Sequence, residues 1–285
     1  MLESFLVTSR ETLEASLVVG IVLAYLNKTN NRSYRKTVYY GVLFGIITSI
    51  LSAFAFTVFA GGFEGSGEQI FEGVTMLIGT LLLTTMILWM MQQRHIAKEI
   101  EGKVERHLMS AQPFLSHMGI FMIIFIAIIR EGVETVIFLN AINYASGINF
   151  LGGTLGIIAA VIVGYLFFVS TKKINLKKLF NISSILLILF AAGLVARSFH
   201  EFEEAKIVGG IITPLFDISP SANSGGIYHL FNENGMVGAF LKGLFGYNPS
   251  PSLLEVIAYV SYLAIIFVLY RRIESSKVKI NASNV

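Results

Sequence analysis

The sequence predicts an all-α polytopic membrane protein with seven transmembrane helices, its N-terminus outside and its C-terminus in the cytoplasm. Of the 285 residues, 54% are hydrophobic and only 14% are charged. The charges form short clusters between apolar runs of about 18 residues or more, and such runs can cross roughly 30 Å of hydrocarbon at ~1.5 Å per residue. The basic residues then predict the orientation, because lysine and arginine collect on the cytoplasmic side of a membrane.

The seven apolar segments alternate between basic and non-basic connections. They lie at about residues 5–26, 38–60, 70–91, 114–142, 151–170, 179–199 and 252–270. Lysines and arginines follow the first, third, fifth and seventh segments, whereas the connections 61–69 and 143–150 contain none. We therefore expect a multi-pass protein of the cytoplasmic membrane whose net charge of +3 reflects topology and not a nucleic-acid partner.

We expect one membrane domain made of two related halves. The sequence Arg10-Glu11-Thr12-Leu13-Glu14 recurs as Arg130-Glu131-Gly132-Val133-Glu134. The first copy lies on a helix predicted to run inward and the second on one predicted to run outward, so the repeat would be inverted. The predicted parts are repeat one (about 1–112), repeat two (113–206), an external cap (207–251), a seventh helix (252–270) and a cytoplasmic tail (271–285).

Each Arg-Glu-x-x-Glu motif forms a one-sided polar cluster. At 100° per residue, the arginine and the second glutamate lie ~40° apart around the helix and the two glutamates ~60° apart. Each charge near the centre of a membrane helix costs ~2.5 to 3.5 kcal/mol, so six of them oppose insertion by something like 15 to 20 kcal/mol. Buried ion pairs or a proton relay would explain some of these charges, but four carboxylates against two guanidinium groups favour a cation site.

The residue types limit which cation such a site would hold. The absence of cysteine excludes thiolate and iron–sulfur sites, so oxygen or imidazole must supply the ligands. Carboxylates on two helices would form a cage suited to hard cations such as Fe3+, Fe2+ or Mn2+. Arg10 and Arg130 would orient these carboxylates and limit their excess negative charge.

The paired motifs resemble those of the oxidase-dependent iron permease family, which includes the fungal high-affinity ferric permease and the bacterial EfeU-type permeases. Further similarity lies in three segments: Phe71-Glu72-Gly73, Trp89-Met90 and Gly246-Tyr247-Asn248-Pro249-Ser250-Pro251-Ser252. One Arg-Glu-x-x-Glu motif arises easily by chance, but two inside apolar segments at inverted-repeat positions are a specific pattern.

The resemblance implies transport of iron across the cytoplasmic membrane. Its metal-coordinating residues would be Glu11, Glu14, Glu131 and Glu134, with iron as the transported substrate and no cofactor. It also implies a separate extracytoplasmic protein that oxidises or delivers the iron. The rival hypotheses are a permease for another cation such as manganese or lead, an intramembrane Glu/Arg enzyme such as a lipid-phosphate hydrolase, and a structural membrane subunit.

A second acidic cluster lies at the predicted outer end of the sixth apolar segment. It contains His200, Glu201, Glu203 and Glu204, and Glu72 opens the third segment on the same side. These residues form a candidate acquisition site for cations. The alternative is an ordinary charged helix end, in which the acids pair with Arg197 or Lys206.

Overall fold

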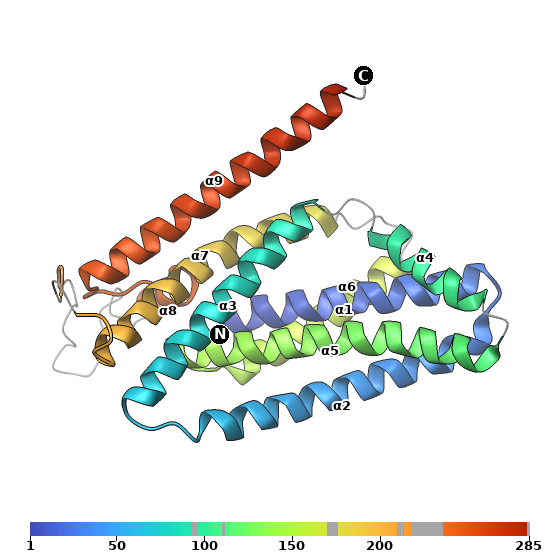
Figure 1. Cartoon of the computed structure of the whole chain (residues 1–285), viewed down its shortest axis with the longest axis horizontal. Helices are drawn as coiled ribbons and strands as arrows, with labels where there is room; N and C mark the ends of the chain where they lie inside the picture. Colours follow the sequence, from blue (N-terminus) through green and yellow to red (C-terminus); the bar gives the residue numbers. More distant parts are fainter. Residues whose placement is uncertain are drawn as a thin grey trace.

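The computed structural model of the chain is a bundle of α-helices (Figure 1). It describes residues 1–92, 96–109, 112–169, 176–209, 212, 214–217 and 236–283. Within these ranges the helices are α1 (Leu2–Lys28), α2 (Arg35–Ala60), α3 (Ser66–Gln92), α4 (Ile96–Leu108), α5 (Pro113–Ser146), α6 (Phe150–Val169), α7 (Leu176–Glu204), α8 (Met236–Phe245) and α9 (Leu253–Ser283), with one short 3-10 turn at Arg32–Tyr34. The described residues contain no strand.

In the described part of the chain, the seven predicted apolar segments correspond to the long helices α1, α2, α3, α5, α6, α7 and α9. In the described part of the chain, five stretches are long and apolar enough to cross a membrane: Arg32–Ala60, Ser66–Met90, Phe150–Phe168, Phe180–Glu204 and Leu253–Ile273. The two remaining long helices, α1 and α5, carry the charged motifs.

The helices pack in pairs that connect the first half of the chain with the second. The main pairings are α1 with α6, α2 with α5, and α3 with α7. The motif helices α1 and α5 also pack against each other and run in opposite directions (Figure 1), and α9 packs on α7.

Small residues allow α2 and α6 to approach the motif helices closely. A side chain at Gly41 or Gly45 of α2 would collide with Ile124 or Ile128 of α5. On α6, a side chain at Gly156 would collide with Thr8 of α1, and the Thr8 hydroxyl also donates a 2.9 Å hydrogen bond to the Gly153 carbonyl oxygen. Such seams of small residues are a common way for membrane helices to gain packing contacts.

Two apolar clusters lie on either side of the charged motifs. One contains Val7 of α1 and Phe138 of α5, and the other contains Val22 of α1 and Ile128 of α5. The charged residues of each motif lie between its two apolar partners in sequence. The packing therefore encloses the motifs at mid-depth in the bundle.

The two longest connections were predicted with different success. The one after α3 differs from expectation, and the one after α7 lies partly outside the described residues. In residues 92–113 the four-residue spacing of Ile96, Ile100, Val104 and Leu108 predicts that the third helix continues into the cytoplasm as an amphipathic stalk. This prediction was wrong, because α4 packs back on α1 and α5. Its apolar face explains this, because Ile100 and Val104 join the cluster around Val22. Of the predicted cap at 207–251, α8 is described, and residues 218–235 lie outside the described part.

Candidate functional site

The two motifs bring three carboxylates together between α1 and α5. Glu11 of α1 and Glu131 and Glu134 of α5 each offer a ligand oxygen, and these oxygens all lie within 4.8 Å of one another. Both Glu11 and Glu131 are buried. Three of the four motif glutamates therefore lie close together, as the sequence predicted.

The fourth glutamate, Glu14, lies beside this group. Its Oε1 lies 3.2 Å from Nε of Arg10, the same kind of ion pair within one helix that Glu134 makes with Arg130. Glu14 also lines the same cavity as Arg130 and Glu131. It thus borders the carboxylate group from the side of α1.

The arginine of the second motif contacts both of its glutamates. Arg130 Nε donates a 2.9 Å hydrogen bond to Glu134 Oε1 and lies 3.9 Å from Glu131 Oε1. Arg130 therefore contacts both carboxylates of its own motif, and its orienting role stays a prediction.

Several buried oxygens at the site accept no hydrogen bond from the described residues. They are both carboxylate oxygens of Glu11, Oε1 of Glu14 and Oε2 of Glu131. A buried carboxylate without a donor costs several kcal/mol, roughly, unless a cation or a proton compensates it. Since the two arginines can neutralise only two of the four carboxylates, the surplus negative charge and the unpaired oxygens both face the point where the helices meet.

Two residues at the end of α3 contact the arginines of the two motifs. Arg10 Nη2 donates a 3.3 Å hydrogen bond to the sulfur of Met90, and the guanidinium of Arg130 lies 5.8 Å from the ring centre of Trp89. These adjacent residues form one of the segments that carry the family resemblance. The geometry gives them a physical role, because each one contacts a different motif.

A cavity of about 1210 Å³ extends from the motifs toward α4. Glu14, Arg130 and Glu131 line it at the motifs, while Lys103 and His107 line it at α4. Between them its wall is mostly apolar, with residues such as Val18, Ile21, Met122, Ile123 and Phe167. The carboxylate site is thus accessible from the end of the bundle where α4 lies.

The predicted acquisition residues lie at the opposite end of the bundle and do not all form one group. Glu201 is buried and pairs with Arg197 at 3.1 Å, as the alternative hypothesis expected. Glu204 Oε1 lies 3.0 Å from His200 Nε2. Glu72, near the start of α3, is half-buried and within electrostatic range of Glu201.

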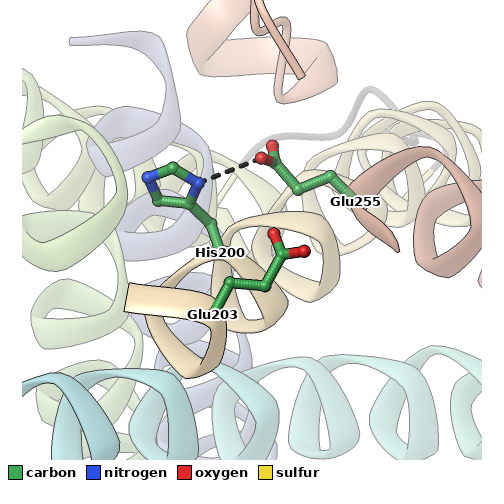
Figure 2. A group of neighbouring side chains, drawn as sticks. All are labelled: His200, Glu203 and Glu255. Atoms are coloured by element: carbon green, nitrogen blue, oxygen red, sulfur yellow. Dashed lines mark hydrogen bonds and ion pairs between the residues drawn. The ribbon is translucent and has the colours of Figure 1, made fainter. Parts of the chain in front are cut away.

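His200 and Glu203 instead join a residue that the sequence analysis did not select (Figure 2). Glu255, in the first turn of α9, lies with its Oε1 3.0 Å from His200 Nδ1. A signal for it was present in the sequence, since Ser252-x-x-Glu255 before an apolar run is the pattern of a helix capping box.

Comparison with known proteins identifies the family. The profile of the iron permease FTR1 family matches residues 1–278. An uncharacterized protein of Archaeoglobus fulgidus is 32% identical over 218 residues, which are 76% of each chain. The ferrous iron permease EfeU of Escherichia coli is 29% identical over 233 residues, 80% of this chain and 83% of the relative. The protein of that name from Yersinia pestis is 28% identical over 222 residues, 77% of this chain and 78% of the relative.

No solved structure gives a significant match to the chain. The sequence relatives nevertheless agree with the apolar helices in indicating a membrane protein, and those from Escherichia coli and Yersinia pestis are named as permeases. This chain belongs to the iron permease FTR1 family.

Proposed function

We propose that this protein conducts iron inward across the cytoplasmic membrane through a carboxylate site made by the two Arg-Glu-x-x-Glu motifs. The observation that carries the proposal is the convergence of Glu11, Glu131 and Glu134 within 4.8 Å. Both carboxylate oxygens of Glu11 and Oε2 of Glu131 are buried and lack hydrogen-bond donors among the described residues, so a cation is the partner that this geometry fits best. Glu14 completes the carboxylate set, and Arg10 and Arg130 orient it.

The proposed architecture has seven spans in a 3+3 inverted repeat, with one further helix. A two-fold operation that exchanges α1 with α5, α2 with α6, and α3 with α7 would turn the α1–α6 pairing into the α5–α2 pairing. Both of these pairings occur, and the α3–α7 and α1–α5 pairings map onto themselves. An ion site where the two halves meet is the arrangement expected for transporters of this kind.

The orientation follows from the basic connections. Most of the lysines and arginines lie around the α1–α2 connection, in α4, in residues 172–178 and at the end of α9, and they favour the cytoplasmic side. The cavity leads from the carboxylates toward α4, so an ion released from the site would have a path in that direction. Inward movement is the direction that this arrangement supports.

Ferrous iron is the first substrate to test, because the relatives from Escherichia coli and Yersinia pestis are named ferrous iron permeases. Oxygen ligands also suit Fe3+ and Mn2+, so manganese is the chemically closest competitor. A separate extracytoplasmic protein that oxidises or delivers iron would complete the uptake system, as the family resemblance implies.

The decisive experiment measures iron uptake by the purified full-length protein in liposomes that contain an iron-sensitive chelator. We expect Glu11→Gln combined with Glu131→Gln to reduce the initial rate of uptake by roughly 100-fold, as loss of a buried charge partner costs about 3 kcal/mol. Glu105→Gln, at an exposed position on α4, is the matched control and should transport normally. Wild-type uptake by the double variant would overturn the proposal, and manganese competition would define the substrate.

A further inference from the structure

A second group of potential metal ligands joins the end of α7 to the start of α9 (Figure 2). His200 Nδ1 or Nε2 and one oxygen each from Glu203 and Glu255 lie within 4.8 Å of one another. His200 and Glu203 share a face of α7 because they are three residues apart. Glu255 comes from a different helix, so the group depends on the packing of α9 against α7.

Local hydrogen bonds hold the Glu255 carboxylate in place. The Ser252 amide donates to Glu255 Oε1 at 3.2 Å, and the Glu255 amide donates to the Ser252 hydroxyl at 3.1 Å. This reciprocal pair is a capping box for α9. Asn248 Nδ2 donates to the other carboxylate oxygen at 2.9 Å, so Glu255 is fixed before any ligand arrives.

Glu203 is in the opposite situation. Both oxygens of its carboxylate are buried, and neither accepts a hydrogen bond from the described residues. Its side chain extends from α7 toward the same space as Glu255 (Figure 2). A buried carboxylate without a donor, placed next to an imidazole and a second carboxylate, has the donor chemistry of a cation site.

The surroundings of His200 resemble those of a histidine that binds a metal. Glu204 Oε1 lies 3.0 Å from His200 Nε2, on the other side of the ring from Glu255. An Nε2–H bond to Glu204 would leave Nδ1 free to bind a metal beside Glu255. Metal-binding histidines commonly donate their other N–H to a carboxylate in this way, which fixes the ring and its tautomer.

We propose that His200, Glu203 and Glu255 bind a divalent transition-metal cation, in a site separate from the carboxylate group of α1 and α5. One imidazole nitrogen and two carboxylate oxygens suit Fe2+, Mn2+ or Zn2+, whereas an imidazole ligand disfavours Ca2+ and Mg2+. The role of this site would be to bind the permeating metal at the outer end of the bundle, and this role rests on the proposed function.

Metal binding tests the site separately from transport. The full-length protein carrying Glu11→Gln and Glu131→Gln, which disables the inner group, would be titrated with Mn2+ in detergent by equilibrium dialysis. We expect one bound Mn2+ per chain, with nitrogen modulation in its pulsed electron paramagnetic resonance spectrum. Adding Glu203→Gln should weaken this binding at least tenfold, and adding His200→Gln should also remove the nitrogen signal.

Two controls keep the result interpretable. Glu64→Gln, at an exposed position near the same end of the bundle, should leave Mn2+ binding unchanged. Because Glu203 makes no hydrogen bond with the described residues, Glu203→Gln should unfold at the same temperature as its parent, and a lost site would then reflect lost coordination.

Absence of Mn2+ binding to the protein with the disabled inner group would overturn the proposal, as would unchanged binding after Glu203→Gln and His200→Gln. Uptake measurements distinguish this failure from failure of the proposed function. With the inner motifs intact, Glu203→Gln should raise the iron concentration for half-maximal uptake several-fold and preserve the maximal rate. If the outer site binds no metal but Glu11→Gln with Glu131→Gln abolishes uptake, the proposed function stands and only the outer site is refuted.

Discussion

The two Arg-Glu-x-x-Glu motifs have the same spacing but different surroundings. The side chain of Arg10 is 1% exposed and is enclosed by Glu14 and Met90. The side chain of Arg130 is 50% exposed, lines the cavity and contacts both glutamates of its own motif. The repeat therefore produces an asymmetric site, in which Arg10 is embedded in the packing and Arg130 lines the cavity.

The glutamates of the two motifs also differ. In the second motif both glutamates belong to the group of three carboxylates, whereas in the first motif only Glu11 belongs to it. Glu14 and Glu134 each pair with the arginine of their own motif, so the difference between them is membership of this group. Sequence symmetry alone would assign equal roles to Glu14 and Glu134. The structure leads to different expectations for them.

The largest expected effect separates these two glutamates. Glu134→Gln removes a carboxylate from the group of three and should reduce iron uptake by roughly 100-fold, whereas Glu14→Gln should reduce it by about tenfold, each tenfold step being ~1.4 kcal/mol. Initial rates in liposomes, corrected for the amount of folded protein, provide the measurement. Equal losses in the two variants would show that the site is symmetric after all.

The arginines provide the second test. Arg10→Lys should lower thermal stability more than Arg130→Lys, because a buried group that loses its partners costs about 1 to 3 kcal/mol and Arg10 is the buried one. Thermal unfolding of the two variants in detergent measures the difference. A larger loss for Arg130→Lys would contradict the comparison.

The contact of α3 with the second motif should have a smaller effect. Trp89→Leu removes the ring beside Arg130, and at an accessible site such a cation–π contact contributes about 0.5 to 1 kcal/mol. We expect a change of a few-fold in the iron concentration for half-maximal uptake. Leu88→Ile, one residue away on the same helix, is the control, and an equal change in both variants would argue against a specific role of the ring.

The smallest effect is expected at the cavity wall near α4. Lys103 donates a 2.8 Å hydrogen bond to Glu99, and this bond lowers the pKa of the Glu99 carboxyl below its ordinary value of 4.5. The pair stabilises the fold above the ordinary pKa, and that contribution disappears as the pH falls through the lowered value. At neutral pH, Glu99→Gln should leave iron uptake within the error of the assay. A large loss would mean that this carboxylate takes part in ion release.

The parts of the structure that follow from local sequence were predictable. Helical periodicity placed the three charged side chains of each motif on one face, and apolar length located the seven long helices. The packing of α4 on α1 and α5 was not predictable. An amphipathic helix must bury its apolar face, but the sequence period does not say against which helix. Glu255 was missed for a similar reason, since its partner His200 lies 55 residues away and only the packing of α9 on α7 brings them together.

The close packing of α1 on α6 has a consequence for the synthesis of the protein. The Thr8 hydroxyl bonds to a carbonyl oxygen 145 residues further along the chain, so α1 emerges from the ribosome long before its main neighbour exists. At ordinary translation rates that interval is about 7 to 30 s. During this time Arg10, Glu11 and Glu14 have neither α5 nor α6 beside them. A helix with three charged motif residues is therefore made long before the helices that pack against it, and its final position in the membrane depends on the second half of the chain.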